Sequence, residues 1–147
     1  MTISRKALCV SYGAIGLLAF IGTWGNIINL VGEHGFWGGT IRFWQDVLAN
    51  ESSRFITVDM LFLGMAVVLW MVLEARRLKI PGVWLYVVFG FFIAISLAVP
   101  LFMIHREIRL SAAVPAEPGG TLRVTVVVAI VSCGLAFTAF AVVALLR

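Results

Sequence analysis

Charged residues are scarce in this sequence, making up only 12% of its 147 residues. Soluble domains carry about 25% charged residues, so this chain has too little charge to cover a soluble domain. The net charge of +4 comes from eleven basic residues, which occur singly or in short runs between apolar segments. Such cations anchor helix ends at lipid headgroups, and they do not form the basic face that nucleic-acid binding requires.

Cysteine and histidine are also rare, with two of each. Cys9 lies near the start of one apolar segment and Cys133 near the middle of another. At such different depths their Cα atoms should be too far apart for a disulfide. Neither His34 nor His105 occurs in a metal-ligand spacing such as H-E-x-x-H. The sequence therefore predicts no metal site and no other cofactor.

Long apolar runs take up most of the chain. Four of them are long enough to cross a hydrocarbon core of about 30 Å, which needs ~20 helical residues. These runs cover residues 7–31, 55–73, 83–104 and 124–146. Backbone groups at that depth must be hydrogen-bonded internally, so we expect helices. The sequence predicts a single transmembrane domain over residues 1–147, with the all-α fold of an integral membrane four-helix bundle.

The distribution of basic residues predicts the orientation of this bundle. Arg5 and Lys6 precede the first apolar run, which is longer than the core of a secretory signal and lacks an A-x-A-like cleavage site, so we expect it to be retained. Four spans leave six basic residues on the side of the N-terminus and five on the other side. The short, cation-rich loop 74–81 favours cytoplasmic N- and C-termini. Glu74 at its start could pair with Arg77 or Arg76 at a helix end.

An amphipathic helix is expected in the first external loop. Residues 32–39 are rich in glycine, and Thr40 is a candidate N-cap for a helix over about residues 40–49. Ile41, Trp44 and Leu48 would share one face of it. A short helix with aromatic residues on its apolar face suits the membrane interface. It would form either a simple lid packed on the bundle or a gate over a ligand site.

Polar residues are predicted to meet near the outer ends of three helices. Asp59 is the one acidic residue clearly inside a span, and an intramembrane carboxylate is a functional candidate. With Trp24, Trp44 and Phe102 as apolar walls, such convergent polar groups are typical of a small-molecule site. The candidate residues of this polar centre are Asn26, Asn29, Asn50, Asp59, His105, Arg106 and Glu107.

Several interpretations of this polar centre stay open. Asp59 could form a structural ion pair with Arg106 or Arg54, or the residues could line a ligand pocket. Asp59 could also act as an acid or base in a membrane-embedded enzyme that acts on a lipid. In a small oligomeric transporter, the stripe Gly90, Ala94 and Ala98 would be buried between copies of the chain.

Three short stretches resemble a known family. They are residues 50–59 (NESSRFITVD), residues 74–80 (EARRLKI) with Trp84, and residues 100–107 (PLFMIHRE). In order and spacing they are similar to the bacterial membrane proteins of domain of unknown function 2834, over about residues 10–108. The resemblance implies a three-span core, beyond which the fourth predicted helix extends, and it implies no catalytic residue. The signature positions of the family match Asn50, Asp59, Glu74, Arg76, Pro100, Arg106 and Glu107.

Together these observations predict a small multi-pass protein of the bacterial inner membrane without catalytic chemistry. We expect membrane lipids around it, and either a bound lipid or isoprenoid-like ligand or a role as an accessory subunit of a membrane assembly. Oligomers are compatible with this expectation, and nucleic acid is not expected as a partner.

Overall fold

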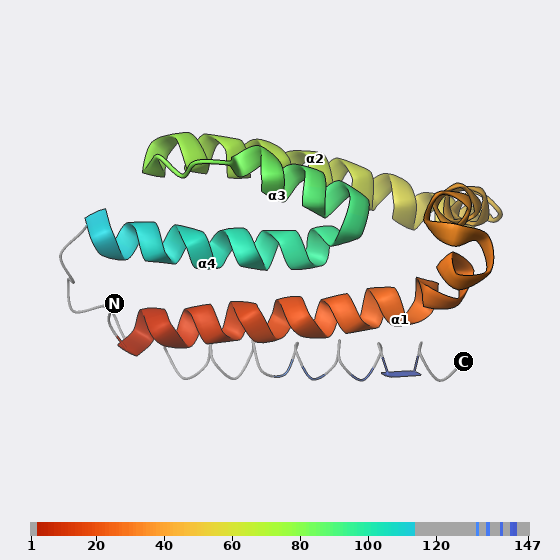
Figure 1. Cartoon of the computed structure of the whole chain (residues 1–147), viewed down its shortest axis with the longest axis horizontal. Coiled ribbons are helices and arrows are strands. Elements are labelled where there is room, and N and C mark those ends of the chain that lie inside the picture. The colour runs from red at the N-terminus through yellow and green to blue at the C-terminus, as the bar shows by residue number, and fades with distance from the viewer. Residues whose placement is uncertain (1–2, 114–131, 133–134, 136–138, 140–141, 144–147) are drawn as a thin grey trace.

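The described part of the chain consists of helices joined by short connections. The described residues of the computed structural model are 3–113, 132, 135, 139, 142 and 143. The elements are α1 (Ile3–Val47), α2 (Glu51–Leu78), α3 (Val83–Phe89), the π-helix η1 (Gly90–Ala94) and α4 (Ile95–Ala113) (Figure 1). No strand occurs among the described residues, and the all-α prediction is confirmed for them.

Three described stretches are long and apolar enough to cross a membrane. They are Arg5–Val47, Glu51–Leu78 and Val83–Ala112. The chain is therefore a membrane protein. The predicted fourth span at residues 124–146 lies almost wholly outside the described residues, so the four-helix bundle is not confirmed.

Helix α1 continues well beyond its predicted end. It is kinked at Gly35, whose φ of 70° suits a residue without a side chain. The expected interfacial helix is the part of α1 after this kink, and Thr40 lies inside it rather than at its N-cap. The Thr40 hydroxyl donates to the carbonyl of Phe36, the usual bond of a threonine within a helix. Ile41 and Trp44, expected on its apolar face, are exposed, and the role of a lid or gate stays a prediction.

Helix α2 is bounded by clear capping groups at both ends. The side chain of Asn50 accepts a hydrogen bond from the backbone N–H of Ser53, which makes Asn50 the N-cap. At the other end Lys79 adopts the left-handed conformation and its N–H bonds the last carbonyls of the helix. Arg76 and Arg77 lie in the last turn, where cations complement the helix dipole.

The third predicted span is not one straight helix. The rings of Tyr86 and Phe102 lie 5.7 Å apart between centroids, whereas 16 residues of straight helix would separate them by about 24 Å. The chain folds back at η1, so that α3 and α4 form a helical hairpin (Figure 1). Gly90 makes this close approach possible, because a Cβ atom there would lie 3.1 Å from the Cβ of Ala98.

Helix α4 packs between α1 and α2. Gly16 of α1 faces Pro100, and the indole N–H of Trp24 donates to the carbonyl of Ile93, so α1 and α4 are antiparallel. Trp70 of α2 stacks edge-on against Phe102, which is 0% exposed at the centre of the core. The C-terminal ends of α2 and α4 therefore lie at the same end of the molecule as the start of α1 (Figure 1). We call this the N-terminal end.

Candidate functional site

The structure divides the seven predicted site residues between the two ends of the molecule. His105, Arg106 and Glu107 lie at the N-terminal end, because the chain folds back before α4. Asp59 lies in the first half of α2 and Asn50 caps its opposite end. The polar centre expected from straight spans is therefore not assembled. The physical reason is the reversal at η1, which a hydropathy pattern does not reveal.

The ion pairs expected for Asp59 are not present among the described residues. Arg106 binds Glu74 and Glu107 instead, and the guanidinium of Arg54 donates to the carbonyl of Leu48 over 3.0 Å. Asp59 itself is exposed on α2.

The two asparagines of α1 are exposed as well. The amide of Asn26 donates locally to the carbonyl of Gly22, and Asn29 lies three residues further along the same helix. A ligand role for these residues stays a prediction.

A buried ion network lies where α2 meets α4. The carboxylate of Glu74, with a side chain only 10% exposed, accepts hydrogen bonds from Arg77 (2.6 and 2.7 Å) and from Nε of Arg106 (2.7 Å). Nη1 of Arg106 also donates to Glu107 over 2.8 Å. Charge-assisted bonds of this kind are strong and directional, and breaking a buried pair leaves an uncompensated charge. The network therefore fastens the hairpin to α2.

Sequence reasoning found part of this network. A pair between Glu74 and Arg77 or Arg76 follows from their spacing at a helix end, and the Arg77 pair is observed. The link from Glu74 to Arg106 spans 32 residues, and no local pattern predicts it. The signal that pointed to it is the family resemblance, whose signature positions include Glu74, Arg106 and Glu107.

Next to this network, Tyr86 of α3 contacts His105 of α4. The Tyr86 hydroxyl lies 2.9 Å from Nδ1 of His105, and the tyrosine ring packs edge-on against Phe102. This hydrogen bond connects the two arms of the hairpin close to its open end. It also places a polar group at the edge of an apolar groove.

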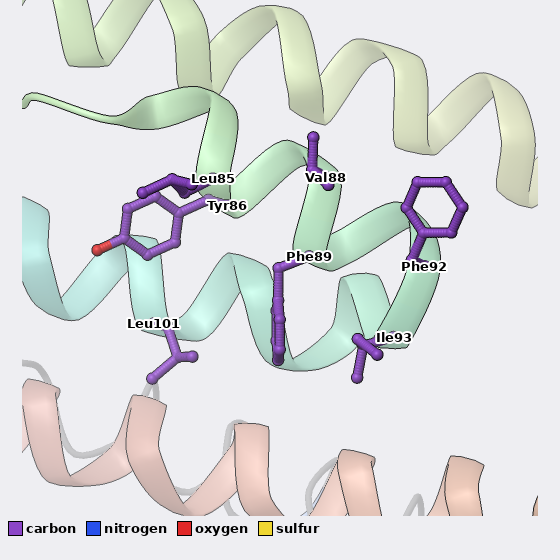
Figure 2. A pocket seen from close by; sticks show the side chains of 7 residues that line it. All are labelled: Leu85, Tyr86, Val88, Phe89, Phe92, Ile93 and Leu101. Carbon is purple, nitrogen blue, oxygen red and sulfur yellow. The ribbon is translucent and has the colours of Figure 1, made fainter.

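The groove runs along the hairpin and has a volume of about 490 Å³. Figure 2 shows Tyr86 toward one end of it and Phe92 and Ile93 toward the other. Its lining residues are Leu85, Tyr86, Val88, Phe89, Phe92, Ile93 and Leu101. Apart from the tyrosine hydroxyl these side chains are apolar, and several of them are exposed, so the groove opens to the outside of the molecule. Trp24, Trp44 and Phe102, expected as walls of a pocket, do not line it.

Cations gather at the N-terminal end beside the groove. Seven basic and two acidic described residues lie there: Arg5, Lys6, Arg76, Arg77, Lys79, Arg106 and Arg109, against Glu74 and Glu107. The described residues toward the opposite end include only two basic ones, Arg42 and Arg54. The acidic residues in that half are Glu33, Asp46, Glu51 and Asp59. The folded hairpin produces this asymmetry, because it carries Arg106 and Arg109 to the N-terminal end.

Asp59 and His105 lie on different ends, so they do not form an acid–base pair. Among the described residues, no three His, Cys, Asp or Glu side chains are grouped to hold a metal ion. Ala94 and Ala98 are buried inside one copy of the chain, which counts against the expectation that their stripe lies between copies of a transporter.

Comparison with known proteins is consistent with the resemblance seen in the sequence. No match was found among curated proteins or among solved structures. A family model described as "Protein of unknown function DUF2834" matches residues 11–108. The matched region begins in α1 and ends in α4 just after Glu107, so it includes the hairpin and the ion network. The chain therefore belongs to the DUF2834 family of proteins of unknown function.

Proposed function

We propose that this protein is a non-catalytic membrane protein that holds the apolar chain of a lipid or isoprenoid-like molecule in the groove of the α3–α4 hairpin. The observation that carries the proposal is the groove itself. It has a volume of about 490 Å³ and an apolar lining. Pockets that bind small molecules are typically 300–1,000 Å³ and mainly apolar, with a few polar groups that orient the ligand.

The dimensions of the groove fit a single flexible chain. The lining follows α3 from Leu85 to Phe89, about 6 Å along the helix axis, and continues onto η1 at Phe92 and Ile93. Exposed apolar side chains on its rim allow a chain to enter sideways from the bilayer. No step of this function needs a proton donor, so the dispersal of Asp59, Asn26 and Asn29 away from the groove is compatible with it.

We also propose that the protein lies in a bacterial cytoplasmic membrane with its N-terminal end toward the cytoplasm. Four straight spans were expected to leave six basic residues on the side of the N-terminus and five on the other side, which is a small difference. With the folded hairpin, the described residues include seven basic ones at the N-terminal end and two at the opposite end. An excess of cations near the ends of spans favours the cytoplasmic side. The predicted side of the C-terminus depends on residues 124–146, which lie almost wholly outside the described part.

The groove can be tested by filling it. Leu101→Trp adds an indole to the lining, and Leu63→Trp makes the same change at an exposed position of α2 away from the groove. After gentle extraction, native mass spectrometry should show a retained lipid-like molecule on the wild type and on Leu63→Trp. That molecule should be depleted on Leu101→Trp. Val88→Trp provides a second filled groove if Leu101→Trp lowers the folded yield.

Two results would contradict the proposal. Equal retention on the filled and control variants would show that the molecule binds elsewhere. A wild-type protein that carries no small molecule and co-purifies only with one other protein would identify an accessory subunit, the other role expected from the sequence.

A further inference from the structure

We propose that the molecule held in the groove is a lipid with an anionic, phosphate-bearing headgroup, and that His105 and Arg109 bind this headgroup. The inference rests on the proposed function, because it assigns the headgroup of the same ligand. An apolar chain by itself gains little by leaving the bilayer for the groove, since lipid tails are as apolar as the lining. Selective binding therefore needs a contact with the polar part of the ligand.

The geometry of α4 supplies a path from chain to headgroup. Leu101 lines the groove, and His105 and Arg109 follow it at intervals of four residues. Residues at this spacing lie on one face of a helix, about 6 Å apart along its axis. A ligand whose chain passes Leu101 toward the N-terminal end therefore meets His105 first and Arg109 next.

The N-terminal end keeps a net positive charge after the ion network has formed. Both acidic residues described at this end, Glu74 and Glu107, already accept hydrogen bonds from arginine. Arg106 and Arg77 are the donors of those bonds. Arg109 takes part in none of the ion pairs found among the described residues, so its charge is available to an anion. Several further cations lie at the same end of the molecule, and their positive charge is complementary to that of a phosphate group.

His105 is oriented by its neighbour from the other arm of the hairpin. When the Tyr86 hydroxyl donates to Nδ1 of His105, the proton of the neutral imidazole is on Nε2. Nε2–H is then a donor for a phosphate oxygen. Since Tyr86 also lines the groove, one residue contacts the chain and orients the group that contacts the headgroup.

The test compares two lipids that differ only in the headgroup. Purified full-length protein in a neutral detergent is incubated with equal amounts of phosphatidylglycerol and phosphatidylcholine with identical acyl chains, and native mass spectrometry counts each bound lipid. We expect roughly a fivefold preference for phosphatidylglycerol, the factor for about one cation near an anionic headgroup. Raising the salt concentration should reduce this preference in the wild type, which tests the charge without any variant.

Arg109→Gln should bring the preference close to one without removing the bound lipid, and Arg109→Lys should retain most of it. Arg42→Gln is the matched control, since Arg42 lies at the opposite end. Equal binding of both lipids by the wild type, lost from both in Leu101→Trp, would overturn the headgroup assignment and leave the proposed function standing. Loss of the preference on adding inorganic phosphate, at an ionic strength at which sodium chloride leaves the preference in place, would also overturn it, because the site would then bind free phosphate rather than a lipid.

Discussion

Arg106 of α4 reaches Glu74 of α2, with Nε 2.7 Å from Oε1, although the two residues are 32 positions apart in the chain. Together with the contact between Trp70 and Phe102, this ion pair shows that α4 runs parallel to α2, whereas a straight third span would run antiparallel to it. The ion pair and the reversal at η1 are thus two parts of one arrangement. Together they determine which polar residues of the protein lie close to one another.

Arg106→Gln should destabilise the protein by about 2 kcal/mol. The change leaves Glu74 with one arginine and Glu107 with none, and losing one partner of a buried pair costs 3–5 kcal/mol, less here because the Arg106 side chain is 23% exposed. Thermal unfolding in detergent measures the difference. Arg42→Gln breaks a pair whose side chains are 55% and 53% exposed, and it should change stability by less than ~0.5 kcal/mol. Equal effects of the two substitutions would show that the network is not structural.

Asp59→Asn should leave the folded yield and the retained ligand unchanged. Asp59 is exposed on α2, has no ion pair within the described residues and does not line the groove. Removing a charge from an apolar span has no desolvation cost of its own. The measurement is the folded yield by size-exclusion chromatography, followed by native mass spectrometry. Loss of the ligand in a variant with normal yield would restore the interpretation of Asp59 as a site residue.

Residue 112 should be accessible from the same side of the membrane as residue 6. The hairpin returns to the N-terminal end, whereas a straight third span would place residue 112 on the side of residue 52. Single-cysteine variants Lys6→Cys, Ser52→Cys and Ala112→Cys, made without Cys9 and Cys133, can be labelled in intact cells by an impermeant maleimide. We expect Ser52→Cys alone to be labelled. Labelling of Ala112→Cys together with Ser52→Cys would disprove the hairpin in the membrane.

Gly90→Ala should destabilise the hairpin by roughly 1–3 kcal/mol, the usual range for overpacking. A Cβ at this position would lie 3.1 Å from the Cβ of Ala98, and the backbone of Ile95 is also close. Gly32→Ala is the control, because a Cβ there meets nothing within 4 Å. Unfolding temperatures of the two variants provide the comparison. A loss of stability in Gly32→Ala as large as in Gly90→Ala would mean that the contact with Ala98 is not the cause.

Much of the local structure could be predicted because its signals are local. The predicted spans 7–31 and 55–73 lie inside α1 and α2, and the pair between Glu74 and Arg77 follows from helical spacing. The helix ends at Asn50 and Lys79 were not predicted, and the N-cap expected at Thr40 is wrong. The predicted site was less accurate, because it assumed that every apolar run crosses the bilayer once. With that assumption His105, Arg106 and Glu107 fall beside Asp59, whereas in the structure Arg106 joins Glu74 to Glu107 and His105 contacts Tyr86.

The sequence by itself determined that this is an all-helical membrane protein, and it identified the family through short motifs. Hydropathy and length suffice for this, since the energy of placing an apolar helix in a bilayer depends on its own residues. The tertiary structure alone decided the direction of α4, the partner of Arg106 and the position of the groove. These depend on contacts between distant segments, such as Gly90 with Ala98 and Trp24 with the carbonyl of Ile93, and no single stretch of sequence contains them.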